Sequence, residues 1–147
     1  MDHKISIYDK NNMPNEAKQE AIANFLYTHL DEYGDEKKYI SKCMDYALEK
    51  FDSKGGFVMT IEDGDTIKAA TIFNHTGMGG YIPENILVYI ATHSDHRGEG
   101  LGSTLMKKAI DHAKGDVALH VDRDNPAKGL YEKLGFTNPY LEMRLKR

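Results

Sequence analysis

Residues 86–102 read ILVYIATHSDHRGEGLG, and this stretch decides the fold. An apolar run leads into three glycines at alternate positions, Gly98, Gly100 and Gly102, and then into apolar residues at helical spacing. This order predicts a buried strand, a glycine turn and a helix. The first backbone N–H groups of such a helix have no partner within it, and the positive end of its dipole lies beside them. Because glycines place no side chain in the way, we expect a site for a pyrophosphate at this turn.

The composition sets broad limits on the kind of protein. A chain of 147 residues, 40% hydrophobic and 29% charged, is typical of one globular domain spanning residues 1–147. The net charge of -4 argues against a general nucleic-acid surface. A single cysteine, Cys43, allows no intrachain disulfide. With no signal-like N-terminus and no apolar run of membrane-spanning length, we expect a cytoplasmic protein that does not associate with membranes.

Alternating and helical spacings predict the other elements along the chain. The dipeptide Asp63-Gly64 is favoured in tight hairpins, so the strands beside it should be antiparallel. We expect strands at residues 4–8, 57–61, 66–73, 85–92 and 117–121, a short strand pair from residue 136 onward, and helices at 14–30, 36–50, 100–114 and 126–134. This order fits neither a run of βαβ units nor a pure meander. It predicts an α/β (α+β) fold with a mixed, mostly antiparallel central sheet and helices on both faces.

Three phosphate-binding patterns compete for the glycine turn. The chain has no pair of glycines five apart followed by Lys and Ser or Thr, which excludes the NTPase loop. The glycine spacing and the element order also differ from the dinucleotide-binding fingerprint. The third pattern, Arg/Gln-x-x-Gly-x-Gly/Ala between a strand and a helix, is matched at every defined position from Arg97 to Gly102. That pattern resembles the acetyl-coenzyme A loop of the GNAT superfamily of N-acetyltransferases.

A second segment strengthens the resemblance. Residues 125–136, NPAKGLYEKLGF, look like a later signature of the same family, in which an Asn opens a helix that ends Tyr-x-x-x-Gly-Phe. The two segments and the element order cover about the last 65 residues. The first half of the chain is not matched to any particular member of the family.

The resemblance implies acetyl-CoA as acyl donor. The backbone of residues 98–103 would hold the pyrophosphate, and Arg97 would either reach a phosphate or cap local carbonyls. The backbone at the end of the strand would bind the pantetheine arm, and Asn125 would contact that arm while capping its helix. Thr92 and Ser94 stand where Val and Pro are frequent, which leaves the local geometry of the loop open. The implied cofactor-binding residues are Ile90, Ala91, Thr92, Arg97, Gly98, Glu99, Gly100, Leu101, Gly102, Ser103, Asn125 and Tyr131.

Two residues are the catalytic candidates. Tyr131 would act as general acid toward the departing thiolate, although a packing role for a core tyrosine is the simpler alternative. Glu84 would act as general base, since some family members carry a catalytic Glu at this place. In the absence of a bulge it shares a face with Ile86, Val88, Ile90 and Thr92. A solvated carboxylate is the alternative for Glu84, and His93, His75, Tyr89 or a water chain are further candidates for the base.

The acceptor is the least constrained part of this interpretation. In the resembling family the acceptor lies against the first two helices, their connecting loop and the last hairpin, and here that loop is acidic (Asp31, Glu32, Asp35 and Glu36). Negative potential attracts a cationic amine, whereas an ordinary solvated turn is the simpler alternative. We expect direct attack by a primary amine of a small molecule or peptide in a ternary complex, with no metal. A catalytically silent acyl-CoA-binding regulatory module, a protein N-terminal or lysine acetyltransferase and a homodimer remain open.

Overall fold

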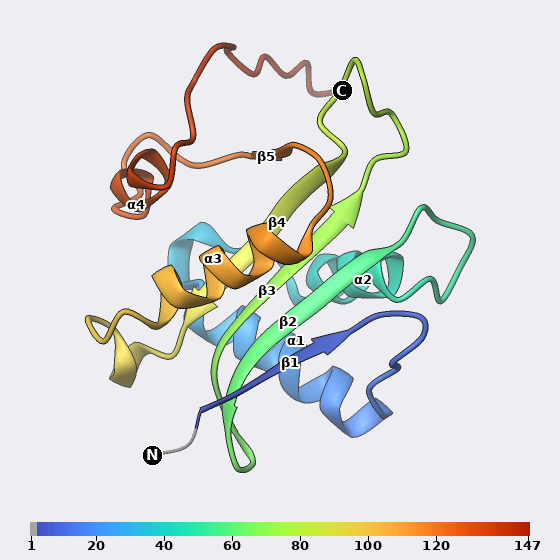
Figure 1. Ribbon diagram of the computed structural model, residues 1–147, viewed down its shortest axis with the longest axis vertical. Helices are drawn as coiled ribbons and strands as arrows, with labels where there is room; N and C mark the ends of the chain where they lie inside the picture. The colour runs from blue at the N-terminus through green and yellow to red at the C-terminus, as the bar shows by residue number, and fades with distance from the viewer. Residues whose placement is uncertain (1–2) are drawn as a thin grey trace.

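A five-stranded mixed sheet forms the centre of the computed structural model, which describes residues 3–147 (Figure 1). The strands follow the order β1-β2-β3-β4-β5. The pairs β1–β2, β2–β3 and β3–β4 are antiparallel, and the pair β4–β5 is parallel. This confirms the predicted mixed, mostly antiparallel sheet. The elements are β1 (Lys4–Tyr8), α1 (Glu16–His29), η1 (Asp31–Tyr33), α2 (Lys37–Ala47), β2 (Gly56–Asp63), β3 (Thr66–His75), β4 (Asn85–Thr92), η2 (Ser94–His96), α3 (Leu101–His112), β5 (Val117–Leu119) and α4 (Lys128–Lys133).

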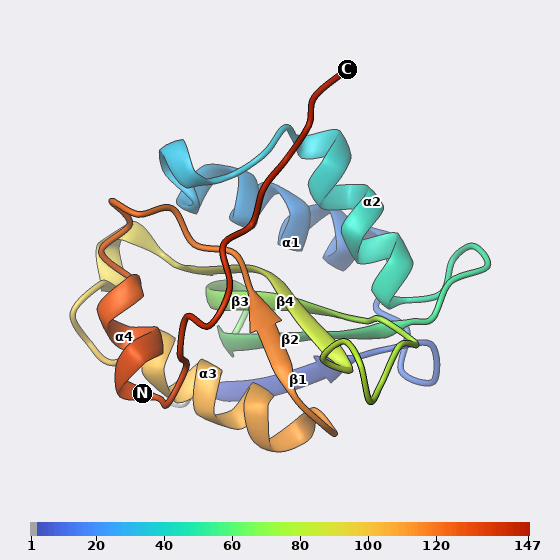
Figure 2. The same cartoon turned by 90° about the horizontal axis from the view of Figure 1, so that it is seen from above.

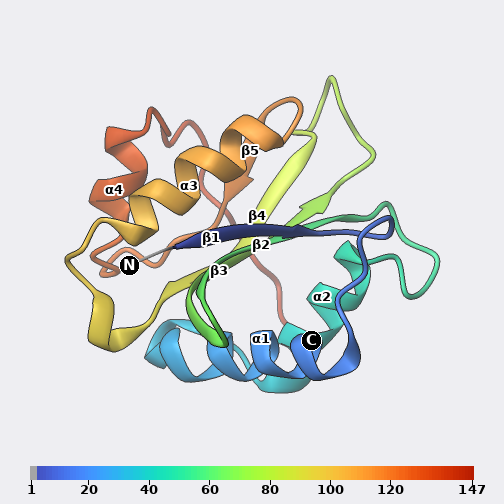
Figure 3. The same ribbon diagram turned by 60° about the horizontal axis from the view of Figure 1, so that its bottom comes forward.

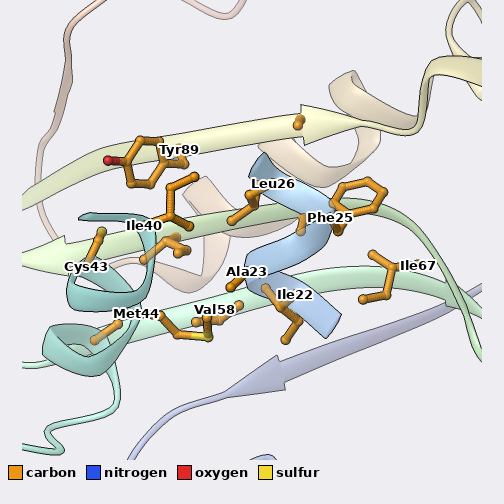
Figure 4. Close-up of a cluster of buried hydrophobic side chains, with 14 of the residues drawn as sticks. Ile22, Ala23, Phe25, Leu26, Ile40, Cys43, Met44, Val58, Ile67 and Tyr89 are labelled. Atoms are coloured by element: carbon orange, nitrogen blue, oxygen red, sulfur yellow. The ribbon is translucent and has the colours of Figure 1, made fainter. Parts of the chain in front are cut away.

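Helices cover both faces of the sheet, as the sequence predicts. Helices α1 and α2 lie on one face and α3 and α4 on the other (Figure 3). Because successive strand residues point to opposite faces, each strand supplies both layers of the core. On β2, for example, Val58 packs in the cluster beneath α1 and α2, which Figure 4 shows in close-up, whereas Phe57 and Met59 pack in the cluster beneath α3.

Local signals explain where the first two helices begin and end. The Asn15 side chain caps α1 by accepting a hydrogen bond from the Lys18 N–H, 2.7 Å away. The apolar spacing predicts a second helix over residues 36–50, but α2 ends at Ala47. Glu49 adopts a left-handed backbone conformation, with φ at +54°, and this interrupts the helical path.

A β-bulge on β4 changes which side chains share a face. Ile72 of β3 pairs with Tyr89, whereas the next residue, Phe73, pairs with Leu87, so Val88 has no partner. Val88 and Tyr89 therefore both pack toward α1 and α2, and Ile90 packs toward α3. Glu84, Ile86, Val88, Ile90 and Thr92, expected on one face only in the absence of a bulge, do not share a face, because the extra residue reverses the alternation.

Strands β4 and β5 pair over only three residues of each strand. Asn85, Ile86 and Leu87 face Val117, Ala118 and Leu119, and pairing ends there. The fully buried Asn85 holds this junction, since its side-chain amide donates to the Lys114 and Asp116 carbonyls at 2.8 and 3.2 Å. Residues 88–92 of β4 consequently have no strand on their β5 side among the residues that the structure describes.

The last segment of the chain differs from the prediction. Residues 136–147 form no strand, so the strand pair expected there is wrong. Strand β5 is also shorter than the predicted 117–121, and α4 begins at Lys128 rather than residue 126. Gly135, with φ at +101°, redirects the chain after α4, and Pro139 lacks the N–H group that a sheet ladder needs. Within residues 3–147, no helix combines the length and the apolar character needed to cross a bilayer.

Candidate active site

The glycine turn between β4 and α3 has the backbone that its sequence predicts. Gly98 and Gly100 adopt positive φ angles of +87° and +81°, and Gly100 is the residue that precedes α3. A side chain is disfavoured in this conformation, so both positions require glycine for the turn itself. A Cβ atom built at either residue would meet no protein atom within 4 Å. The turn therefore leaves open space beside its backbone.

The backbone N–H groups of the turn are available to a ligand. In the part of the chain that the structure describes, no protein atom accepts a hydrogen bond from the N–H groups of residues 98–103. The first N–H group with a protein partner is that of Thr104, which donates to the Gly100 carbonyl at 3.0 Å. Unpaired N–H groups at the positive end of α3 suit a pyrophosphate. Leu101 anchors this turn in the core, and Gly102 lies against Thr92 of β4.

Arg97 ties the turn to the first helix. Its guanidinium donates to the His29 carbonyl at 2.7 Å, at the end of α1, and forms an ion pair with Asp31 at 3.2 Å. Of the two roles considered from sequence, the structure contains the contact with a local carbonyl, and the phosphate contact stays a prediction. Glu99 lies on the same loop with its carboxylate 3.2 Å from the His96 ring.

Three histidines stack where α1 meets the turn, a feature that sequence reasoning missed. The His93 ring lies 4.2 Å from the His29 ring and 5.3 Å from the His96 ring, between centroids. The Ser94 N–H donates to Nδ1 of His29 at 3.1 Å. Burial lowers the pKa of His29, and the nearby His93 and Arg97 lower it further. The contact between His29 and His93 joins residues 64 positions apart, so no local signal could have revealed it.

The open side of β4 provides the surface expected for an extended ligand. Ile90, Ala91 and Thr92 pair with β3 on one side, and the separation from β5 leaves their other side without a strand. An exposed strand edge offers backbone hydrogen bonds to an extended chain. Because this edge leads directly into the glycine turn, a pyrophosphate held there would be continuous with an arm lying along β4.

Tyr131 lies on α4 in the core cluster beneath α3. Its side chain is 7% exposed, and its ring meets Phe136 edge to face at 6.0 Å between centroids. Burial raises the pKa of the Tyr131 phenol, so the group stays protonated at neutral pH. A protonated phenol is the form that a general acid requires, and its role in catalysis stays a prediction.

Asn125 holds the turn that precedes α4. Its side-chain oxygen accepts a hydrogen bond from the Ala127 N–H at 2.9 Å, and its carbonyl accepts one from Lys128 at 3.1 Å. The residue that immediately precedes the helix is Ala127, so the prediction that Asn125 caps α4 is corrected to a turn contact just before it. A contact with the pantetheine arm stays a prediction.

Glu84 lies at the opposite end of β4 from the glycine turn. Its carboxylate accepts a hydrogen bond from the Asp116 N–H at 3.0 Å, and its side chain packs on Gly115. Thr92 lies eight positions along the extended chain from Glu84, a span of about 26 Å. This placement favours a structural contact with the turn between α3 and β5, and it does not favour the predicted role as base.

The other candidates for the base are engaged in structural contacts. Burial and a hydrogen bond to Asp35 raise the pKa of Tyr89, which opposes a role as proton acceptor at neutral pH. The Tyr89 hydroxyl donates to the Asp35 carboxylate at 2.5 Å and so ties the loop between α1 and α2 to β4 just beyond the bulge. His75 lies within 2.9 Å of the Asn85 side chain, and His93 belongs to the histidine stack.

Two cavities are formed by segments that are distant in the sequence. The η1 turn and the connection between β5 and α4 lie side by side (Figure 2). The larger cavity, about 470 Å³, lies between these two segments, and its lining is mostly acidic: Glu32, Tyr33, Asp122, Arg123 and Asp124. The Tyr33 hydroxyl reaches the Asp124 carbonyl at 3.4 Å across it. The smaller, about 270 Å³, has a largely apolar lining between α2 and the β3–β4 end of the sheet. Within residues 3–147, no three His, Cys, Asp or Glu side chains are grouped to hold a metal ion.

Comparison with known proteins agrees with this geometry. A family model described as "Acetyltransferase (GNAT) family" matches residues 17–136. No curated protein was found to match the chain. Among solved structures, it is similar to a ribosomal-protein-alanine N-acetyltransferase from Brucella melitensis biovar Abortus 2308, with 15% identity, 100% of both chains covered and a TM-score of 0.69.

Two further structures share the fold. An aminoglycoside N-acetyltransferase in complex with CoA has 11% identity and a TM-score of 0.71, with 99% of this chain and 95% of that chain covered. A transcriptional regulator from Bacillus halodurans C-125 has 21% identity and a TM-score of 0.68, with 98% of this chain and 100% of that chain covered.

Substitution of Gly100 tests the turn. Gly100→Ala must place a Cβ at a left-handed position, which costs about 1–2 kcal/mol, and we expect an affinity for CoA about tenfold lower by calorimetry. Gly129→Ala is the matched control, because a Cβ there also meets no atom within 4 Å but lies inside α4. Equal CoA affinities in the two variants would contradict the assignment of the turn.

The histidine stack predicts a dependence of stability on pH. In the unfolded chain, His29 has the ordinary histidine pKa of about 6.5. Folding lowers the pKa of His29. As the pH falls, the unfolded state therefore binds more protons than the folded state. Stability contributed by neutral His29 is therefore complete above about pH 6.5 and is lost on acidification. Thermal melts should show a smaller loss between pH 7.5 and 5.5 in His29→Gln than in the wild type. Tyr27→Gln, at an exposed position of the same helix, should keep the wild-type dependence.

Proposed function

Because this chain belongs to the Acetyltransferase (GNAT) family and is therefore an acetyl-CoA-dependent N-acetyltransferase, we propose that it acetylates a primary amine of a cationic small molecule or peptide by direct attack. The observation that carries the proposal is the set of unpaired N–H groups at residues 98–103, which lie at the end of the open β4 edge. Together they offer one anion site and one open strand edge, the two features that a diphosphate with a long thiol-bearing arm requires.

Each part of the donor site has a distinct physical task in this proposal. The N–H groups of residues 98–103 neutralise the pyrophosphate, and the backbone of residues 90–92 orients the arm through strand-like hydrogen bonds. A backbone N–H group of this edge would stabilise charge on the thioester oxygen as the amine attacks. Nitrogen forms a bond to the acetyl carbon, the carbon–sulfur bond breaks, and Tyr131 gives its proton to the sulfur that leaves. The bonded nitrogen then loses one proton to water, and a proton from water restores the Tyr131 phenol.

The acidic cavity supports a cationic acceptor. Three of its lining residues are carboxylates, and the adjoining loop adds the Asp35 carboxylate held against Tyr89. Negative groups on both walls favour ammonium groups over neutral amines. The two N-acetyltransferases of similar fold are named for ribosomal-protein alanine and for aminoglycosides, so the shared fold alone does not select between a peptide and a small molecule.

Deprotonation of the acceptor does not depend on one dedicated residue in this proposal. The carboxylate of Glu84 lies at the far end of β4, and Tyr89 is held as a protonated phenol by burial and by Asp35. Water in the polar cavity would carry the proton away from the ammonium group. Activity should then rise with pH as the amine of the acceptor itself loses its proton.

Tyr131→Phe tests the role of the phenol. We expect kcat to fall about 100-fold, because the thiolate then leaves without a proton donor, while CoA affinity changes little. Tyr140→Phe serves as control, since Tyr140 is 85% exposed in the C-terminal segment. Steady-state rates from thiol release, together with calorimetry, separate the two effects. Unchanged kcat in Tyr131→Phe would remove the phenol from the mechanism.

A panel of polyamines, aminosugars and peptides with free amines identifies the acceptor class. We expect turnover with cationic acceptors. In the double variant Asp122→Asn/Asp124→Asn, the KM for these acceptors should rise about fivefold for each charge removed, when measured at low salt. Asp52→Asn, at an exposed bend outside the cavity, should keep the wild-type KM. CoA binding without turnover on any acceptor would instead favour a silent acyl-CoA-binding module. Activity restricted to peptides would favour a protein N-terminal or lysine acetyltransferase.

A further inference from the structure

The smaller of the two cavities adjoins the open part of β4. This cavity, about 270 Å³, lies between α2 and the β3–β4 end of the sheet, and we call it the apolar cavity. Its wall includes Ile86 and Val88 of β4, Met78 of the loop between β3 and β4, and Tyr46 of α2. Val88 is also the first residue of β4 beyond the segment that pairs with β5. The apolar cavity therefore reaches the start of the open strand edge.

Three of the polar side chains in the wall are engaged within the protein. The Tyr46 hydroxyl donates to the His75 carbonyl at 2.7 Å, and the Thr76 hydroxyl donates to the Pro83 carbonyl at 2.8 Å. Nδ1 of His75 lies 2.9 Å from the side-chain oxygen of Asn85. Because these groups already have partners, the cavity favours a ligand through apolar contact and shape rather than through hydrogen bonds.

Asn74 completes the polar part of the wall. Its amide donates to Sγ of Cys43 at 3.4 Å, and its side-chain oxygen is buried with no hydrogen-bond partner in the part of the chain that the structure describes. Since this oxygen is closed off from solvent, a group bound in the cavity does not meet it.

The size of the apolar cavity sets the size of its ligand. An apolar cavity of about 150 Å³ inside a protein is large enough to bind benzene. The 270 Å³ available here therefore accommodates an aromatic ring or an aliphatic chain of about six carbons. Met78 is 38% exposed and also lines the cavity, so it lies at the entrance.

A carboxylate lies close to the apolar cavity. Tyr89 follows Val88 in the chain, and its hydroxyl donates to the Asp35 carboxylate at 2.5 Å. Asp35 in turn follows Tyr33 of the acidic cavity by two residues. Ile90, where the proposed path of the donor arm begins, lies two positions beyond Val88, about 7 Å along the strand. An ammonium group attracted to this carboxylate would thus have an apolar cavity on one side and the donor edge on the other.

We propose that the apolar cavity binds part of the acceptor, which is therefore a primary amine that carries an aliphatic or aromatic group of about six carbons. This inference rests on the proposed function, because it assumes acetyl transfer beside the open edge of β4. Met78, Ile86 and Val88 contact the apolar group, and each methylene that leaves water for the cavity strengthens binding. An entirely polar amine, such as an aminosugar, gains nothing from this cavity.

A series of linear primary amines from ethylamine to hexylamine measures the contribution of the cavity. The amine has nearly the same basicity throughout the series, so differences in rate report the contacts of the chain. We expect kcat/KM, followed by thiol release, to rise about threefold for each added methylene. A kcat/KM that does not depend on chain length would overturn the proposal.

Two variants of the loop between β3 and β4 locate the effect. In Met78→Gln, the kcat/KM for hexylamine should fall about fivefold, whereas that for ethylamine should stay at the wild-type value. Ile82→Gln is the matched control, because Ile82 is 39% exposed on the same loop and does not line the cavity. Equal losses in the two variants would contradict the assignment of the cavity.

Binding to the cavity is also measurable without turnover, by NMR of the protein labelled at its methionine methyl groups. Hexylamine should shift the Met78 signal, identified by its loss in Met78→Gln, in a saturable way. The signal of Met13, which is 48% exposed and does not line the cavity, should stay in place. A Met78 shift without turnover of any amine would support the cavity and count against the proposed function. Turnover of hexylamine without a Met78 shift would overturn the cavity and leave the proposed function standing, and neither shift nor turnover would contradict both.

Discussion

The bulge at Val88 of β4 and the end of β5 pairing at Leu119 set the geometry on which the rest of this structure depends. Strand β4 is held along its length by β3, whereas β5 holds only its first three residues. The bulge turns the strand where the two separate, and the fully buried Asn85 keeps the paired end closed. An open edge next to a helix N-terminus follows from these constraints, and the donor site is built from that juxtaposition.

Side-chain contacts between residues distant in the sequence hold the loop between α1 and α2 against the glycine turn and β4. Arg97 connects the glycine turn to the end of α1 and to Asp31 of η1, and Tyr89 connects β4 to Asp35 in the same loop. The loop between α1 and α2 is thus attached to β4 both at the turn and just beyond the bulge. Whatever binds in the acidic cavity therefore meets a wall that is fixed to the donor site.

Sequence reasoning succeeded where the signal was local. Positive φ angles at Gly98 and Gly100, the capping of α1 by Asn15 and the alternation in β2 each depend on a few neighbouring residues. The facing of Glu84 relative to the far end of β4 could not be predicted in this way, because the bulge at Val88 depends on the pairing with β3. The contacts of Arg97 with His29, and of Tyr89 with Asp35, join residues more than fifty positions apart, and neither partner carries a local mark of the other.

The sequence by itself determined the element order up to α4, the mixed sheet with helices on both faces and the glycine turn, because backbone permissiveness and apolar periodicity are properties of short segments. Only the tertiary structure decided which carboxylates line a common cavity, that Glu84 packs on Gly115, and that residues 136–147 form no strand pair within the chain. These outcomes depend on which edges and faces remain free once the core has packed, and that depends on all the elements together.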